Sequence, residues 1–80
     1  MTQNGKVPTA PSRGELSSIT HSFIENSAII KTFLRRFLRR QQDIDDVAQE
    51  AYLKAYVAEQ EKSIEHPKSY LFTIAKNIAI

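Results

Sequence analysis

The chain has 80 residues, enough for one domain with a small hydrophobic core. It contains no cysteine, which excludes a disulfide framework, a thiolate metal site and a cysteine nucleophile, and which fits a reducing compartment. The formal net charge of +2 is too small to indicate nucleic-acid binding by itself, and no apolar run approaches the roughly 20 residues that cross a bilayer, so we expect a soluble protein.

Residues 1–17 are rich in residues that break regular structure. They contain both glycines and two of the three prolines of the chain, among polar side chains and almost no apolar ones. Such a segment cannot bury enough apolar surface to offset the entropy lost on ordering. We therefore expect a disordered N-terminal tail over residues 1–17, followed by a helical domain over residues 18–80.

Apolar residues recur at offsets of three and four from Ile30 to Leu38, and no alternating pattern competes. This spacing predicts a first helix over about residues 27–40. The preceding stretch, residues 19–26, either begins this helix or forms a separate short turn, because several Ser, Thr and Asn side chains there could cap a helix. The outer surface of the helix would carry five basic side chains: Lys31, Arg35, Arg36, Arg39 and Arg40.

Two interpretations of this basic surface stay open. Basic residues near the end of a helix complement its macrodipole, and three acidic residues, Asp43, Asp45 and Asp46, do the same where the next helix would start. The arrangement therefore has a purely structural use. The same surface could instead contact nucleic-acid phosphates or an acidic protein.

A second apolar stripe, from Ile44 to Ala58, predicts a helix over about residues 43–59, with the Asp43 carboxylate as its cap. Polar residues at 59–63 replace the apolar positions and end the pattern. The residue before Pro67 is disfavoured in a helix, whereas proline suits a first helical turn. A third helix is therefore expected over about residues 67–79, after a short loop.

One face of the second helix is polar. Asp46, Gln49 and Glu50 stand at offsets of three and four and so project together, and Lys54 follows Glu50 by four residues. A face of this kind is commonly only solvated, and its ion pair contributes little. Two aromatic side chains that suit either an interface or the edge of the core border it: Tyr52 and Tyr56.

The third helix combines aromatic rings, hydroxyls, an amide and a cation within residues 69–77. Single-stranded bases are held by stacking on such rings and by hydrogen bonds from such polar groups. Tyr70 and Phe72 could equally cover the core. The buried side would be formed by Leu71, Ile74, Ala75 and Ile78. Because the chain ends inside this pattern without a capping residue, we expect the natural protein to continue beyond Ile80.

No arrangement of residues in the sequence indicates catalysis. His21 and His66 are the only histidines, and neither belongs to a local metal motif or triad. There is no glycine-rich phosphate loop. We therefore expect a protein that is not an enzyme, without metal, cofactor or small-molecule substrate.

Two linked segments together resemble region two of the extracytoplasmic-function sigma factors. Residues 45–56, DDVAQEAYLKAY, are similar to the acidic helix of that family, D-D-x-x-Q-E-x-(aromatic)-L-(basic)-A. Residues 67–77, PKSYLFTIAKN, are similar to its P-(basic)-(small)-(aromatic)-L-F-T-I-A-(basic)-N helix. Residues 33–40, FLRRFLRR, resemble the first conserved helix, so the resemblance covers about residues 20–80. The sequence of residues 67–71, PKSYL, looks most like that of the iron-uptake subgroup of the family.

The resemblance implies an all-α, three-helix domain of a cytoplasmic protein that binds core RNA polymerase and recognises and melts the minus-ten promoter element. The acidic helix of the family docks on the clamp coiled coil of the largest polymerase subunit. At that interface the resemblance places five residues: Asp46, Gln49, Glu50, Tyr52 and Tyr56.

The next loop and helix of the family capture an extruded base of the single-stranded non-template strand. The corresponding contacts would be loop residues 64–66 together with Ser69, Tyr70, Thr73, Lys76 and Asn77. The resemblance also implies an anti-sigma factor as a partner. The family normally continues into a linker and a helix-turn-helix domain that reads the minus-thirty-five element, which these 80 residues do not include.

Two other functions remain as alternatives. One is a helical protein-interaction module, in which the face of the third helix binds a protein instead of DNA. The other is a non-specific nucleic-acid-binding domain that uses the surface from Arg35 to Arg40, whose affinity would fall steeply with salt.

Overall fold

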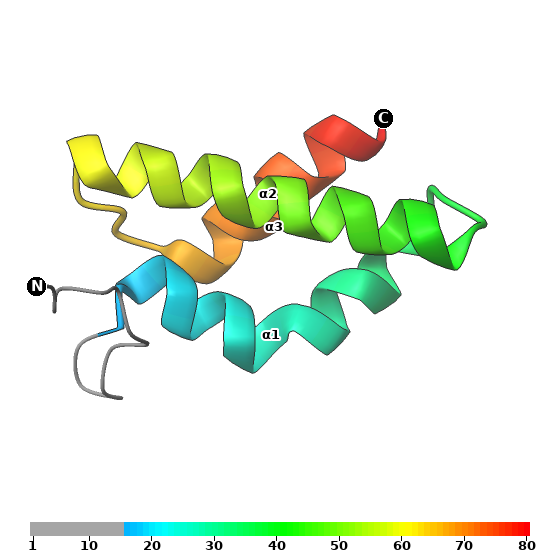
Figure 1. Ribbon diagram of the computed structural model, residues 1–80, viewed down its shortest axis with the longest axis horizontal. Helices are drawn as coiled ribbons and strands as arrows, with labels where there is room; N and C mark the ends of the chain where they lie inside the picture. The colour runs from blue at the N-terminus through cyan, green and yellow to red at the C-terminus, as the bar shows by residue number, and fades with distance from the viewer. Residues whose placement is uncertain (1–15) are drawn as a thin grey trace, which may run out of the picture.

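Three α-helices follow one another in the computed structural model, which describes residues 16–80 (Figure 1). They are α1 (Ser18–Leu34), α2 (Gln41–Glu61) and α3 (Pro67–Ala79). Within the described residues there is no strand, so the all-α expectation is confirmed. The expected disordered tail lies outside the described residues except for its last two, and its boundary stays a prediction.

α1 begins earlier than the predicted residue 27. The Oγ of Ser17 accepts a hydrogen bond from the backbone N–H of Thr20 at 3.0 Å, which satisfies one of the free donors at the helix start. Residues 19–26 therefore begin the first helix and do not form a separate turn.

The predicted end of the first helix at residue 40 is wrong. α1 ends at Leu34, where the backbone tightens: the N–H of Arg36 bonds to the carbonyl of Phe33 at 3.2 Å, and that of Phe37 bonds to Leu34 at 2.9 Å. A tight turn with hydrogen bonds between residues i and i+3 can carry apolar residues at the same spacing as an α-helix. The periodicity alone therefore could not distinguish this turn from a continuation of the helix. Leu38 still packs against the core from this turn.

The basic residues accordingly do not form one helical surface. Lys31 lies on α1 and Arg35 is its C-cap, whereas the other three arginines are exposed in the connection between α1 and α2. Lys31 Nζ lies 3.2 Å from the Asp45 carboxylate, and Arg35 Nη1 donates to Gln41 Oε1 at 3.0 Å. Two of the five basic residues, Lys31 and Arg35, therefore form polar contacts between the end of α1 and the start of α2.

α2 begins at Gln41, two residues before the predicted start, and Asp43 is not its cap. The backbone of Arg40 occupies the N-cap position, and the N–H of Ile44 bonds to the Arg40 carbonyl at 3.1 Å. Asp43 lies in the first turn, where its charge still favours the positive end of the helix dipole. The helix continues to Glu61, two residues past the prediction.

α3 starts with Pro67 in its first turn, as predicted, and packs against both other helices. Its Leu71 and Ala75 are completely buried. The core also contains large aliphatic side chains of α1 and Ile44 of α2, while the rest of the buried face of α2 consists of Ala48, Ala51 and Ala55. Small side chains allow helices to approach closely, and α2 contacts both neighbouring helices.

The chain reverses direction at each connection. The α1–α2 turn lies at one end of the bundle, and the α2–α3 loop lies at the other end, beside the start of α1 (Figure 1). The N–H of Ile19 in α1 bonds to the Glu59 carboxylate near the end of α2, at 3.2 Å, which fixes this second end. None of the helices described here is long and apolar enough to cross a membrane.

Candidate functional site

The outer face of α2 carries the polar residues singled out in the sequence. Asp46, Gln49 and Glu50 are all exposed, on the side of the helix opposite to its alanine face. Lys54 Nζ lies 4.0 Å from the Glu50 carboxylate, a loose and exposed pair of small energetic value. The three side chains are therefore free to contact a partner.

A neighbouring carboxylate, Asp45, has a different role. It accepts a hydrogen bond from Gln41 Nε2 at 2.9 Å and pairs with Lys31 of α1. The hydrogen bond from Gln41 and, after it, the contact with Lys31 lower the pKa of Asp45 below its ordinary value of 3.8. Asp45 thus serves the joint between α1 and α2, whereas Asp46 points outward.

The two tyrosines of α2 lie in different surroundings. The Tyr52 hydroxyl lies 2.8 Å from Thr20 Oγ1, and its ring is 4.9 Å from the ring of Phe23, centroid to centroid, so this half-buried side chain packs on α1. Tyr56 is 40% exposed and lies beside Tyr52, with the ring centroids 6.0 Å apart. Tyr56 is therefore the more accessible of the two rings.

Two large apolar residues on the same outer face were missed in the sequence. Leu53 is 50% exposed and Val57 is 60% exposed. The signal was present, because both stand opposite the alanine stripe that forms the buried face of α2. They follow Gln49 and Glu50 by one and two helical turns.

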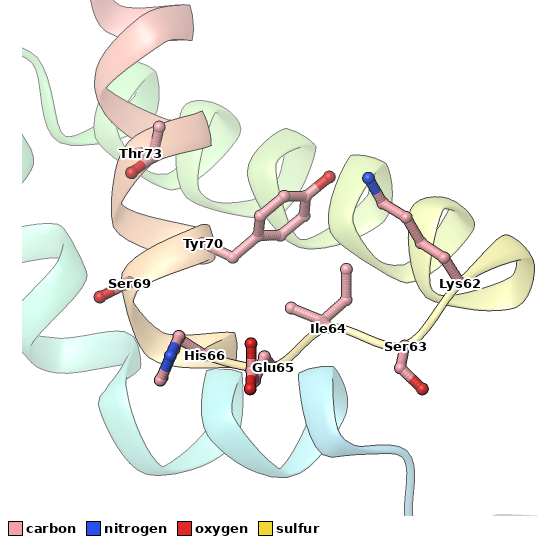
Figure 2. Close-up of a pocket in the computed structure, with 8 residues that line it drawn as sticks. All are labelled: Lys62, Ser63, Ile64, Glu65, His66, Ser69, Tyr70 and Thr73. Atoms are coloured by element: carbon pink, nitrogen blue, oxygen red, sulfur yellow. The ribbon is translucent and has the colours of Figure 1, made fainter.

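A pocket of about 380 Å³ lies where the α2–α3 loop meets the first two turns of α3 (Figure 2). The Tyr70 ring extends from α3 toward Ile64 of the loop and Lys62 (Figure 2). The remaining lining residues are Ser63, Glu65, His66, Ser69 and Thr73.

The pocket brings together three of the five residues predicted to contact DNA, Ser69, Tyr70 and Thr73, with loop residues 64–66. Lys76 and Asn77 do not line it; they are exposed one turn further along α3, at offsets of three and four from Thr73. The sequence did not single out Lys62 and Ser63, because only the bend of the loop brings them to the pocket.

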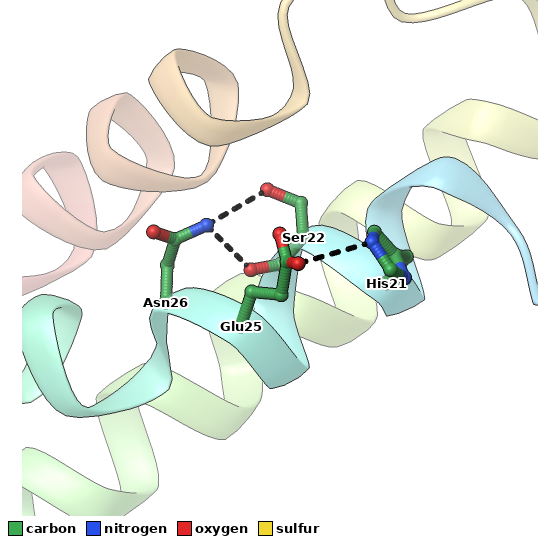
Figure 3. A network of polar contacts seen from close by, with 4 residues as sticks. All are labelled: His21, Ser22, Glu25 and Asn26. Atoms are coloured by element: carbon green, nitrogen blue, oxygen red, sulfur yellow. Dashed lines mark hydrogen bonds and ion pairs between the residues drawn. The ribbon is translucent and has the colours of Figure 1, made fainter.

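The polar contacts on α1 stabilise that helix. Asn26 Nδ2 donates to the Ser22 carbonyl at 2.8 Å and to Ser22 Oγ at 3.3 Å, and His21 Nε2 lies 3.3 Å from the Glu25 carboxylate (Figure 3). Both members of the second pair are exposed. Among residues 16–80 no three His, Asp or Glu side chains are grouped as metal ligands.

The fold and the two helix motifs together define a sigma-factor domain. Residues 23–80 match the sigma-70 region 2 family, and this match covers more than half of the chain, which therefore belongs to that family.

Among individual proteins, the ferric citrate uptake sigma factor FecI of Escherichia coli is 39% identical to this chain over 51 residues. These residues make up 64% of the chain and 30% of FecI, so the chain corresponds to less than a third of that protein. No solved structure matches the chain. The expected resemblance to region two of extracytoplasmic-function sigma factors is confirmed.

Proposed function

We propose that this chain binds core RNA polymerase and recognises and melts the minus-ten promoter element in transcription initiation. The observation that carries the proposal is the pocket between the α2–α3 loop and α3. Six of its eight lining residues are ones that the family resemblance assigns to base capture, and they come from the α2–α3 loop and from α3. Melting of this kind uses binding free energy and needs no catalytic residue.

The pocket suits a nucleobase. Its volume of about 380 Å³ falls within the range of small-ligand sites, about 300–1,000 Å³. Extruding a base costs a few kcal/mol, and stacking on an aromatic ring returns about 1–3 kcal/mol per base. Tyr70 supplies the ring and Ile64 an apolar surface, while the hydroxyls of Ser69 and Thr73 can bond to base edges.

The DNA strand would continue from the pocket along the outer face of α3. Lys76 and Asn77 lie on that face, one turn beyond Thr73, and both are exposed. A lysine binds the phosphate backbone as a point charge, and an amide bonds to base edges or sugar oxygens. These two residues therefore form the second part of the proposed DNA contact.

The outer face of α2 is the proposed polymerase-binding surface. Asp46, Gln49 and Glu50 offer carboxylate and amide groups that match a partner with basic and hydrogen-bonding side chains. The proposed partner is the clamp coiled coil of the largest subunit. Tyr56 would contribute its exposed ring, and Tyr52 the part of its ring that α1 leaves accessible.

This function would place the chain in the cytoplasm, where polymerase acts on the chromosome. We also propose that the chain is regulated by an anti-sigma factor, the kind of partner that the family resemblance implies. An anti-sigma factor that covered either the outer face of α2 or the pocket would block one of the two required contacts.

The base-capture proposal is tested with Tyr70→Ala. In complex with core polymerase, we expect the variant to bind a single-stranded minus-ten non-template oligonucleotide about 5- to 100-fold more weakly, because one stacking contact is lost. Fluorescence anisotropy measures the affinity, and circular dichroism checks the fold. The matched control is Ile29→Ala, which truncates a 53% exposed side chain of α1 outside both the pocket and the outer face of α2. Equal affinity of wild type and Tyr70→Ala would refute base capture.

The polymerase proposal is tested by reversing the polar face of α2. The double variant Gln49→Lys with Glu50→Lys should lose binding to core polymerase in a pull-down, because positive charge would face a basic partner. The control variant, Glu25→Lys with Thr32→Lys, makes the same change at exposed positions of α1. Retained binding by a folded Gln49→Lys, Glu50→Lys chain would show that the docking assignment is wrong.

One observation favours a second candidate function, the non-specific nucleic-acid binder. Arg36, Arg39 and Arg40 are exposed in the α1–α2 turn. If this turn carries the function, binding should show no sequence preference. A plot of the logarithm of the binding constant against the logarithm of salt concentration should then have a negative slope of roughly 0.7 for each single-strand phosphate contacted. A preference for the minus-ten sequence over a scrambled oligonucleotide distinguishes the proposed function from this one.

A further inference from the structure

The outer face of α2 is acidic at its start and apolar towards its end. Asp46, Gln49 and Glu50 occupy the first part, and Leu53 and Val57 follow on the same side of the helix. From Asp46 to Val57 the strip is about 16 Å long, at 1.5 Å per residue. The two kinds of side chain thus form one continuous surface.

The apolar part of this strip has no partner within residues 16–80. α2 packs on the other helices through Ile44, its buried alanines and half-buried side chains such as Tyr52, and Leu53 and Val57 are not part of this packing. In the second half of α2 the aliphatic side chains larger than alanine are therefore exposed, while the fully buried positions are alanines. A helix with apolar residues on two opposite sides typically buries one side in its own core and the other against a partner.

We propose that Leu53 and Val57 are the apolar anchors of the polymerase-binding surface. The proposal rests on the proposed function, and it adds the chemistry of the partner. The partner surface has basic side chains opposite Asp46 and Glu50 and apolar side chains opposite Leu53 and Val57. Buried apolar contacts at the centre of an interface supply most of its affinity, and surrounding charges set orientation and encounter rate.

The chemistry of the strip predicts two separable contributions. The contribution of Asp46 and Glu50 should weaken as salt concentration rises, because exposed charges are screened over about 8–10 Å at physiological ionic strength. The contribution of Leu53 and Val57 should persist in salt, because burial of apolar surface does not depend on screening.

The test measures the affinity of the labelled 80-residue chain for core RNA polymerase by anisotropy, at low and high salt. The double variant Leu53→Ala with Val57→Ala should bind at least about tenfold more weakly at both salt concentrations. The matched control is Ile24→Ala, which truncates a 62% exposed isoleucine on α1 and should leave the affinity unchanged. Circular dichroism confirms that each variant is folded.

The outcomes separate this inference from the function on which it rests. If Leu53→Ala with Val57→Ala binds like wild type while Gln49→Lys with Glu50→Lys does not bind, the anchors are refuted and the polymerase-binding function stands. If neither variant changes the affinity, both are refuted. If sedimentation shows that wild type dimerises through the strip and polymerase affinity is unchanged in the alanine variant, the strip binds a second copy, and the inference is overturned.

Discussion

At the scale of single residues, Glu59 has a structural role that its position in a polar segment did not suggest. Its Oε2 accepts the hydrogen bond from the backbone of Ile19, at the positive end of α1. Replacing Glu59 by Ala should lower the free energy of unfolding by about 1 kcal/mol, as for the loss of a helix cap. Urea denaturation followed by circular dichroism measures this. Glu61→Ala, at an exposed position two residues later, is the control and should change stability by less than about 0.5 kcal/mol.

The Tyr52 hydroxyl offers a second test at this scale. Tyr52→Phe removes the hydrogen bond to Thr20 and keeps the ring packing on Phe23. We expect the free energy of unfolding to fall by about 0.5–1.5 kcal/mol. Polymerase affinity of the folded variant should stay within twofold of wild type, because the hydroxyl points to α1. A large loss of affinity at unchanged stability would instead place the hydroxyl in the interface.

At the scale of elements, the joint between α1 and α2 depends on pH through Asp45. Its pKa is lowered in the folded chain, so the stabilisation is present above the ordinary value of 3.8 and is lost as pH falls through the folded value. NMR titration should therefore give a midpoint below 3.8 for Asp45 in wild type. Gln41→Ala and Lys31→Ala should each move that midpoint upward. A midpoint unaffected by either change would contradict the assigned cause.

The docking of α3 depends on Leu71, which is fully buried between the other helices. Leu71→Ala should cost about 2–5 kcal/mol, comparable with the roughly 3–5 kcal/mol that a core of this size supplies, so most molecules should unfold. Loss of the helical circular dichroism signal at 25 °C measures this. Leu53→Ala makes the same change at an exposed position and should leave the chain folded.

At the scale of the whole molecule, the structure separates two faces on different helices. The polymerase-facing residues lie on the outside of α2, and the pocket is formed by the α2–α3 loop and α3. Combining Gln49→Lys and Glu50→Lys with Lys76→Glu and Asn77→Ala should therefore change stability additively within about 0.5 kcal/mol. Urea denaturation of the single and combined variants measures the coupling. A larger interaction energy would mean that the two faces share a structural network.

The sequence predicted the three helices because each has a clear apolar stripe, and it predicted the start of α3 because proline at that position has a defined conformational effect. It failed at the end of α1, where Phe33, Leu34 and Phe37 keep the same spacing in a turn. It also missed contacts between distant segments. Glu59 and Ile19 are 40 residues apart, and the pocket exists only because the loop folds back toward α3. Apolar periodicity predicts single helices, and it carries no information on contacts between residues that are far apart in the sequence.

The alanine face of α2 has a mechanical consequence. Ala48, Ala51 and Ala55 have no side-chain rotamers, so they cannot absorb a displacement of the helix by rearranging. A displacement of α2 toward the core therefore has to be taken up by the larger side chains of that core, such as Ile30 of α1 and Leu71 of α3. On the proposed function, α2 would therefore act as a stiff element between the bound polymerase and the captured DNA strand.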